Sequence, residues 1–314
     1  MILGIGEILL DLIVNFNKDI LISGKIGGAP FNVVKFISLL NEKCGFYGIV
    51  GEDEFGKYII NKVNSFNDID SYIEVNKDKN TTLALINKST LGNEKYSFYR
   101  KNTADFSYFY ENLIKLPIDK YSLIHFGSLF LSDGKAIETI TKFITYLKSQ
   151  NKILSIDINY REDIFTNKLE AISRYNKIID KFDIIKFSLD ELNLLSGAIN
   201  KIDYINNLLK KVKVIIVTNG KRGSTIYTSK YKVTSNAYNV KAKGTIGAGD
   251  SFLAGALYLL DKLDLTNLSN NDLNKVINFA SATSALVCLN NDLDKPYNSI
   301  NDINLFIKRN KINM

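Results

Sequence analysis

Short apolar segments alternate with longer amphipathic segments along most of the chain, and this alternation constrains the fold more than any other feature. The segments expected to form strands are residues 2–5, 123–126, 153–158, 184–187 and 214–218. The segments expected to form helices are residues 30–41, 54–65, 133–149, 169–181, 202–211, 250–261 and 271–288. Apolar strands that alternate with helices indicate an α/β fold with a mostly parallel sheet covered on both faces. In such a sheet, ligands bind at the carboxyl ends of the strands.

Two regions, residues 8–24 and 80–110, show the period-two alternation of half-buried strands instead. They are expected to form antiparallel strands that stand apart from the main sheet as a small lid over the site. No repeat, low-complexity tract or linker divides the chain. We therefore expect residues 1–314 to form a single domain.

The composition is that of a globular protein, with 46% hydrophobic and 23% charged residues. His125 is the only histidine, which excludes a multi-histidine metal site, and its apolar surroundings indicate a core residue. Cys44 and Cys288 form neither a disulfide framework nor a zinc-binding pattern. These features are typical of a protein of the reducing cytoplasm.

The formal net charge of +7 raises the question of nucleic-acid binding. The lysines are scattered among Asn, Asp and Glu without a basic run, so no nucleic-acid partner is expected. The apolar start of the chain carries Glu7 and Asp11 and has no basic leader, which argues against a signal peptide. No segment has the ~18 apolar residues of a membrane span. A cytoplasmic location is expected.

The strongest local motif is residues 244–252, Gly-Thr-Ile-Gly-Ala-Gly-Asp-Ser-Phe, which precede an apolar helix. Small residues let the backbone approach a ligand, and the amides at a helix start attract an anion. An acid in this place, Asp250, can accept a proton from a reacting hydroxyl. The alternative is a glycine-rich turn in which Asp250 caps the helix.

A second motif is residues 27–32, Gly-Gly-Ala-Pro-Phe-Asn, before the helix at 30–41. The paired glycines permit close approach, Pro30 suits a first helical turn, and Asn32 can direct its amide at a hydroxyl. The alternative is a tight turn with a capping Asn. The chain has no P-loop and no Gly-x-Gly-x-x-Gly after its first strand, which argues against a P-loop enzyme and a dehydrogenase.

With both motifs in this order, the chain resembles the ribokinase-like (PfkB-type) carbohydrate kinases over nearly its whole length. Further matches are residues 51–56, 157–161 and 218–223. The resemblance implies a three-layer, Rossmann-like ribokinase fold with a β-strand lid. It implies ATP as phosphoryl donor, Mg²⁺ as cofactor and a sugar as acceptor. It also implies a homodimer formed through the lid strands.

The resemblance also implies a role for each matching residue. Asp250 would be the base, and the amides of Gly247, Ala248 and Gly249 would hold the transferring phosphoryl group. The remaining implied residues are Asp11, Gly27, Gly28, Asn32, Arg100 and Arg161 for the sugar, Thr218, Gly220, Gly223, Asn159 and Ser281 for the nucleotide, and Glu191 for magnesium through water.

Three positions depart from the family pattern. Gly244 stands where an Asp usually helps to hold a monovalent cation, and residues 289–292 replace an expected Gly-Ala pair. We therefore expect weak or absent activation by K⁺. Ser188 replaces an Asn three residues before Glu191, so magnesium binding is expected to differ in detail.

The motif at 27–32, the segment 96–105 and residues 125–128 resemble fructokinases, which predicts phosphorylation of fructose to fructose 6-phosphate. The alternatives are a 2-keto-3-deoxygluconate kinase or another furanose or ribose kinase. Arg100 keeps a sugar acid open, since its guanidinium can bind a carboxylate, unless it is only an exposed strand residue. From other classes, a non-catalytic sugar sensor and a nucleic-acid-binding protein remain as alternatives.

Overall fold

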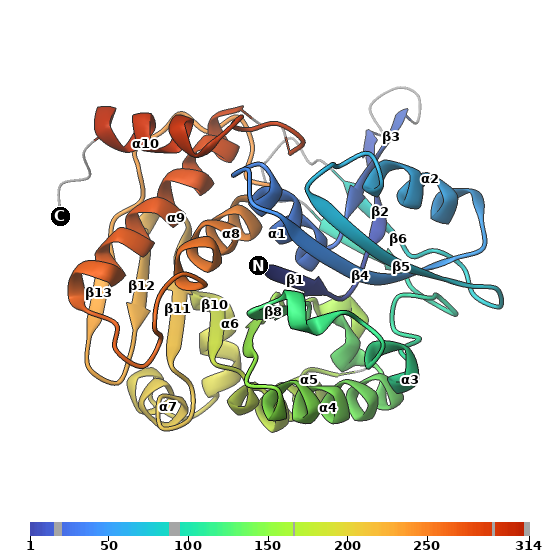
Figure 1. The fold of residues 1–314 in the computed structure, drawn as a ribbon, viewed down its shortest axis with the longest axis horizontal. Coiled ribbons are helices and arrows are strands. Elements are labelled where there is room, and N and C mark those ends of the chain that lie inside the picture. Colours follow the sequence, from blue (N-terminus) through green and yellow to red (C-terminus); the bar gives the residue numbers. More distant parts are fainter. Residues whose placement is uncertain (16–20, 88–94, 166, 291–292, 311–314) are drawn as a thin grey trace.

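The computed structural model describes residues 1–15, 21–87, 95–165, 167–290 and 293–310 of the 314-residue chain. Its centre is a nine-stranded sheet in the order β13-β12-β11-β10-β9-β8-β1-β4-β5 (Figure 1). The strands are β1 (Ile2–Ile5), β4 (Cys44–Gly51), β5 (Ile69–Asn76), β8 (Leu123–Phe126), β9 (Ile153–Asp157), β10 (Ile184–Ser188), β11 (Val214–Thr218), β12 (Ser224–Tyr227) and β13 (Lys232–Ser235). The pairs from β11 to β5 are parallel, and β12 and β13 continue the sheet antiparallel.

Helices cover both faces of this sheet, which gives three layers (Figure 1). The helices are α1 (Ala29–Ser38), α2 (Glu54–Val63), α3 (Tyr110–Leu113), α4 (Gly134–Ser149), α5 (Lys168–Ile178), α6 (Leu189–Ser196), α7 (Lys201–Leu208), α8 (Ala248–Leu260), α9 (Asn270–Asn290) and α10 (Ile300–Arg309). One face carries α1, α8, α9 and α10, and the other carries α4, α5, α6 and α7. The α/β fold class expected from the sequence is confirmed.

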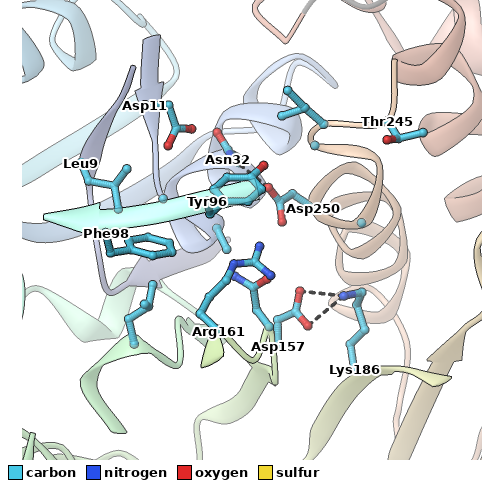
Figure 2. A pocket seen from close by; sticks show the side chains of 17 residues that line it. Leu9, Asp11, Asn32, Tyr96, Phe98, Asp157, Arg161, Lys186, Thr245 and Asp250 are labelled. Atoms are coloured by element: carbon cyan, nitrogen blue, oxygen red, sulfur yellow. Dashed lines mark hydrogen bonds and ion pairs between the residues drawn. The ribbon is translucent and has the colours of Figure 1, made fainter. Parts of the chain in front are cut away.

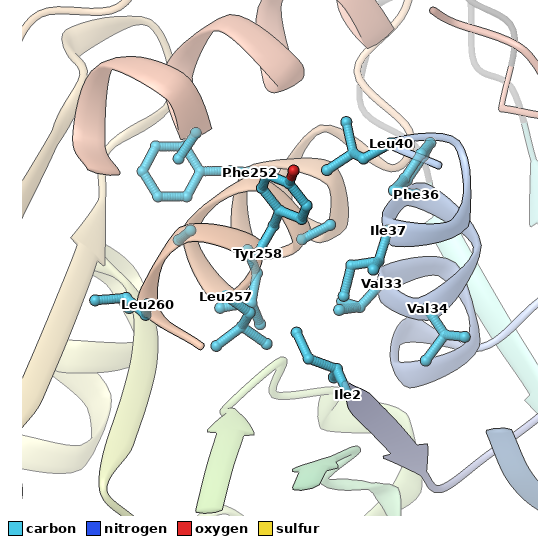
Figure 3. Packing of buried hydrophobic residues seen from close by; sticks show 14 of the residues in the cluster. Ile2, Val33, Val34, Phe36, Ile37, Leu40, Phe252, Leu257, Tyr258 and Leu260 are labelled. Carbon is cyan, nitrogen blue, oxygen red and sulfur yellow. The ribbon is translucent and has the colours of Figure 1, made fainter. Parts of the chain in front are cut away.

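The pleat of the strands explains why both faces are apolar. In β1, Ile2 joins the core cluster beneath α1 and α8, whereas its neighbour Leu3 joins the cluster on the opposite face. Successive side chains of a strand point to opposite faces, so a continuous apolar strand supplies two cores. Figure 3 shows Ile2 beneath the packing of α1, represented by Val33, against α8, represented by Leu257.

A separate four-stranded sheet forms the lid, in the order β3-β2-β6-β7. Its strands are β2 (Leu9–Asn15), β3 (Leu21–Gly27), β6 (Leu83–Asn87) and β7 (Lys95–Tyr99). The pairs β2–β3 and β6–β7 are antiparallel, as expected. The pair β2–β6 is parallel, so the prediction of an antiparallel lid was wrong at this junction. Two strands joined by a short loop pair antiparallel. The direction in which one such pair lies against another is not determined by local sequence.

All five predicted strands and all seven predicted helices are present, with ends that differ by a few residues. The lid strand β3 extends to Gly27, beyond the predicted region 8–24. The strands that the pattern missed include β4 and β5, and the missed helices include α6 and α10. In the described part of the chain, no helix is long and apolar enough to cross a membrane.

The motif at residues 51–56 joins the lid to the main sheet. Asp53 caps α2 by accepting from Gly56 N at 2.8 Å, and it also accepts from the amide and hydroxyl of Thr81 at 2.7 Å each. Thr81 precedes β6, so one carboxylate fixes both a helix start and the entry to the lid. This motif therefore has a structural role behind the site.

Candidate active site

A cavity of about 210 Å³ opens where β9 ends, between the lid and the start of α8 (Figure 2). Residues distant in sequence meet here because the carboxyl ends of parallel strands share one edge of the sheet. Its lining consists of Leu9, Asp11, Gly28, Ala29, Asn32, Tyr96, Phe98, Leu129, Asp157, Asn159, Arg161, Lys186, Thr245, Ile246, Gly247, Gly249 and Asp250. The two glycine motifs that the sequence analysis singled out thus form parts of one cavity.

The turn at residues 247–250, which begins α8 and is called the anion turn below, has the geometry of an anion site. Gly247 is the N-cap residue with φ 74°, a left-handed conformation that favours glycine. Ala248, Gly249 and Asp250 then form the first turn of the helix, so Asp250 is not its cap. The Ala248 amide donates to the Thr245 carbonyl at 3.1 Å, whereas the amides of Gly249 and Asp250 have no partner within the helix and carry the positive end of its dipole. The turn can therefore bind a phosphoryl group beside the Asp250 carboxylate.

Asp250 is held by Asn32, whose Nδ2 donates to Asp250 Oδ2 at 2.8 Å. Burial raises the pKa of Asp250 and the charge of Asp157 raises it further, whereas the Asn32 hydrogen bond and the charges of Lys186 and Arg161 lower it. A carboxylate with a raised pKa is a stronger base than an ordinary Asp. Figure 2 shows the Asn32 and Asp250 side chains next to each other in the cavity wall.

Asp11 enters the same cavity from β2 of the lid. Burial, together with the charge of Asp250, raises the pKa of Asp11 to about 7. A Cβ at Gly27 would lie 2.2 Å from Asp11 Oδ2, so only glycine leaves room for this carboxylate. Gly28, with φ 110°, would place a Cβ 2.2 Å from the Glu7 carbonyl oxygen. Both glycines serve close packing around Asp11 and the start of α1.

Aromatic side chains of β7 cover the cavity. Tyr96 and Phe98 both line it, as the two-residue period of a strand requires. The Arg161 guanidinium lies 5.2 Å from the centre of the Tyr96 ring. The lid therefore contributes an apolar wall, and Arg161 supplies a cation beneath it (Figure 2).

A buried ion pair that was not predicted from the sequence lies at the base of the cavity. Lys186 Nζ lies 2.8 Å from both carboxylate oxygens of Asp157 (Figure 2). Burial alone would lower the pKa of Lys186, but the charges of Asp157 and Glu191 outweigh it and raise the pKa. A Cβ on Gly249 would lie 3.6 Å from Lys186 Nζ, which places this ammonium beside the anion turn. A lone lysine in the apolar strand at 184–188 was the available signal.

Arg100 lies outside this cavity. Its Nε donates to Asp105 at 2.7 Å and its Nη1 donates to Ser132 at 2.6 Å. Its guanidinium also lies 4.9 Å from the ring centre of Phe106. The side chain is only 8% exposed, so neither the predicted sugar contact nor the exposed-strand alternative matches this placement. Through these hydrogen bonds, Arg100 links the end of β7 to Asp105 and Ser132.

The residues predicted to bind the nucleotide do not all lie at one place in the structure. Gly223 lines a second cavity of about 350 Å³ beside the end of β11, and Thr218 and Gly220 flank this place in the chain. A Cβ on Gly223, where φ is 96°, would lie 2.0 Å from the Ser235 carbonyl oxygen. Asn159 lines the first cavity instead, and Ser281 lies buried in α9 and lines neither.

Glu191 forms a capping box at the start of α6. Its carboxylate accepts from Ser188 N at 2.6 Å and Tyr160 N at 2.9 Å, and Ser188 Oγ accepts from Glu191 N. Burial raises the pKa of Glu191. No cluster of three or more metal-ligating side chains occurs among the described residues. A magnesium ion that is bound mainly by phosphates and water, as is usual for Mg²⁺, fits this arrangement.

His125 is a buried core residue, as expected, and does not line the cavity. Its Nδ1 lies 3.2 Å from Ser155 Oγ. Burial lowers the pKa of His125 to about 4, so the ring is neutral at pH 7. The chemistry of the cavity therefore rests on carboxylates, amides and fixed cations.

Comparisons with known proteins agree with this geometry. The sequence profile of the pfkB family of carbohydrate kinases matches residues 5–299. Probable fructokinase-5 of Arabidopsis thaliana is 32% identical over 295 residues, which cover 91% of this chain and 90% of that protein. The fructokinase of Xylella fastidiosa with bound ATP superposes with a TM-score of 0.90 at 22% identity, over 98% of both chains.

A double mutant of the Vibrio cholerae O395 fructokinase, in its fructose, ADP and potassium ion bound form, superposes with a TM-score of 0.85. It is 22% identical over 97% of both chains. These likenesses confirm the ribokinase-like fold, and the family match includes both glycine turns. This protein belongs to the pfkB family of carbohydrate kinases.

Proposed function

We propose that this protein transfers the γ-phosphoryl group of ATP to fructose and forms fructose 6-phosphate. The observation that carries the proposal is that Asp250, a partly exposed carboxyl with a raised pKa, lies in one cavity with the anion turn and with Asp11. Names of relatives support the choice of sugar, since probable fructokinase-5 of Arabidopsis thaliana is 32% identical to this chain.

The chemical step follows from the positions around the turn. Asp250 accepts the proton of the attacking hydroxyl as its oxygen forms a bond to the γ-phosphorus. The bond from that phosphorus to the β–γ bridging oxygen breaks, and its electron pair leaves on ADP. The amides of the turn and the nearby Lys186 ammonium stabilise the negative charge of the transferring group.

The walls of the cavity provide the sugar site. Asp11 and the turn at Gly28 face the sugar hydroxyls from the lid side, and Asn32 holds Asp250 toward them. Tyr96 and Phe98 cover the sugar with apolar surface and exclude water. Exclusion of water favours transfer to the sugar over hydrolysis of ATP.

The nucleotide is assigned to the second cavity, where Asn219 and Gly223 lie in its wall beyond β11. Mg²⁺ bound to the phosphates neutralises their charge and so makes the phosphorus easier to attack. The Glu191 carboxylate accepts hydrogen bonds from the backbone amides of Tyr160 and Ser188, which orient it. Its water-mediated role in binding magnesium stays a prediction. Gly244, which offers no carboxylate, still predicts weak or absent activation by K⁺.

The alternatives are a 2-keto-3-deoxygluconate kinase and another furanose or ribose kinase. The position of Arg100 outside the cavity removes the main argument for a sugar acid, although Arg161 keeps one guanidinium in the site. A non-catalytic sugar sensor needs no base, and the intact pairing of Asp250 with Asn32 favours an enzyme.

A coupled ADP-release assay with fructose, ribose, 2-keto-3-deoxygluconate and nucleosides tests the proposal. We expect kcat/KM for fructose to exceed that of the other acceptors by about tenfold or more, equivalent to ~1.4 kcal/mol of transition-state binding. Preference for another sugar would replace fructose as substrate. Release of ADP no faster with any acceptor than without one would overturn the kinase assignment.

Light scattering tests the predicted homodimer.

A further inference from the structure

Lys35 is a buried cation that the proposed reaction does not use. It lies in α1, three residues after Asn32, and its side chain is 2% exposed. All ten residues of α1 are buried, so the helix passes through the interior beside β1 and α8. Burial of an ammonium is costly unless opposite charges surround it. The surroundings of Lys35 therefore indicate what it does.

Lys35 forms an ion pair with Asp294, with Nζ 3.3 Å from Oδ1. Asp294 is half exposed, at 53%, and follows Leu293. A Cβ on Gly247 would lie 2.6 Å from Leu293 Cδ2 and 3.4 Å from Phe36 Cζ. Residues next to both members of the ion pair thus pack against Gly247, the N-cap residue of α8. The ion pair therefore fixes two side chains, Leu293 and Phe36, that pack against the anion turn at Gly247.

The other charges that act on Lys35 belong to the active site. Burial lowers the pKa of Lys35, and the carboxylates of Asp294 and Asp250 oppose that effect, while Lys25 adds to it. In return, the charge of Lys35 lowers the pKa of Asp11. Lys35 therefore lies behind the cavity wall within electrostatic reach of both cavity acids.

Asp250 is also faced by groups from the other elements. These are Asn32 of α1, Asp157 of β9, Lys186 of β10 and Arg161 after β9. Lys186 and Arg161 act from the side of the main sheet, and Lys35 acts from α1. α1 thus contributes two groups: the Asn32 amide binds Asp250, and the Lys35 ammonium binds Asp294, whose neighbour Leu293 packs against Gly247.

We propose that Lys35 is a positioning residue that acts as a resident cation for the phosphoryl-transfer site. Through Asp294 it holds Leu293 against Gly247, and its charge favours the ionised forms of Asp250 and Asp11. Because the cation is part of the chain, the enzyme does not require a monovalent cation from solution. This inference rests on the proposed kinase reaction.

The test compares Lys35→Met and Lys35→Arg in the full chain, with Lys262→Met as control. Lys262 also forms an ion pair, with Glu42 at 2.8 Å, but at an exposed position. We expect Lys35→Met to lower kcat about tenfold or more, the size of losing one electrostatic contribution, while KM for the sugar changes less than about threefold. Lys35→Arg should stay within about threefold of wild type, because it keeps the charge.

The pH profile separates an electrostatic role from a structural one. Loss of a positive charge raises the pKa of nearby carboxyls, so the acid limb of kcat should move to higher pH in Lys35→Met. Lys35→Arg and Lys262→Met should keep the wild-type limb. An unshifted limb in folded Lys35→Met, or kcat within twofold of wild type, would overturn the inference.

Two further measurements apply if Lys35→Met does not fold. Asp294→Asn changes a half-exposed side chain and should lower kcat about three- to tenfold by weakening the ion pair with Lys35. Wild-type activity should change less than about twofold when K⁺ replaces tetramethylammonium as the salt cation. Unchanged kcat in Asp294→Asn or a large stimulation by K⁺ would contradict the inference. Absence of acceptor-dependent ADP release by wild type would instead contradict the proposed kinase function.

Discussion

Asn32 and Asp250, 218 positions apart in the sequence, share a hydrogen bond of 2.8 Å from Nδ2 to Oδ2. The bond joins the two glycine motifs, since Asn32 lies in the first turns of α1 and Asp250 in the first turn of α8. The proposed role of Asp250 as base then assigns its other oxygen, Oδ1, to a substrate hydroxyl. Each motif alone is a local turn, and their contact turns them into a site.

Substitution Asn32→Leu should raise the pKa of Asp250, because the hydrogen bond from Asn32 lowers it in the wild type. The acid limb of kcat/KM should therefore move to higher pH. Loss of a hydrogen bond to a charged group, worth ~1.5–3 kcal/mol, should also reduce kcat/KM about 10- to 100-fold. The control is Asn274→Leu, since the partly exposed Asn274 amide donates to Asn270 within α9. An unmoved limb in Asn32→Leu would remove the electrostatic role of this bond.

Gly249→Ala separates folding from phosphate binding. A Cβ at this position meets only Lys186, at 3.6 Å or more, and a helical alanine is about 0.5–1 kcal/mol more stable than glycine. We expect equal or higher thermal stability together with about a 100-fold loss of kcat/KM for ATP, because the methyl group fills the anion turn. Gly134→Ala, at a helix start with open space around it, should leave activity unchanged. Full activity of Gly249→Ala would place the phosphate elsewhere.

The Asp157–Lys186 pair should show strong coupling in chemical denaturation. Both side chains are buried, at 2% and 7% exposure, so removal of one partner leaves an uncompensated charge. Lys186→Met should lower the free energy of unfolding by about 3–5 kcal/mol. The double variant Asp157→Asn with Lys186→Met should be more stable than Lys186→Met alone. Additive losses would show that the two charges do not compensate each other.

Sugar binding should release protons near pH 7. The pKa of Asp11 is raised to about 7 by burial and by Asp250, so part of the free protein carries a protonated Asp11. Hydroxyl donors favour the ionised carboxylate, which lowers its pKa in the complex. Affinity should then rise with pH from 6 to 8. Calorimetry in buffers of different ionisation enthalpy measures the release.

Asp11→Asn is the matched variant for this measurement, because it keeps the size of the side chain and cannot ionise. It should bind the sugar more weakly and show a smaller proton release. Proton uptake by the wild type, or the same release in Asp11→Asn, would contradict a direct contact between Asp11 and the sugar hydroxyls.

Much of the fold could be predicted because its signals are local. The buried strands β1, β8 and β11 were placed at their observed ends, since continuous apolar segments fit a doubly covered sheet. β4, with three glycines in Cys44–Gly51, was missed because glycine is rare in strands. The parallel β2–β6 pair depends on how two hairpins meet, which no local pattern encodes.

The site was predictable where one residue type determines the geometry, as at Gly247 and Gly28 with their positive φ values. Arg100 lies outside the cavity because β7 ends at Tyr99, so the alternation that directs Tyr96 and Phe98 to the cavity stops before it. Asp157 and Lys186 meet only through the register of β9 and β10. The assigned contacts of the other site residues and the single-domain organisation stay predictions.

Glu191 shows a signal that was present but not used. Ser188-x-x-Glu191 is a capping-box pattern, and the structure contains both of its hydrogen bonds. This local role accounts for the pairing of Ser188 with Glu191 without a metal ion. Family resemblance alone had assigned the pair to magnesium.

The most direct test of the account is the rate of acceptor-dependent ADP release by Asp250→Asn beside the wild type and the exposed control Asp119→Asn. Loss of a general base should lower kcat by ~10²–10⁴, with thermal stability and sugar affinity close to wild type, whereas Asp119→Asn stays unchanged. Activity of Asp250→Asn within a few-fold of wild type would contradict the assignment of Asp250 as the base.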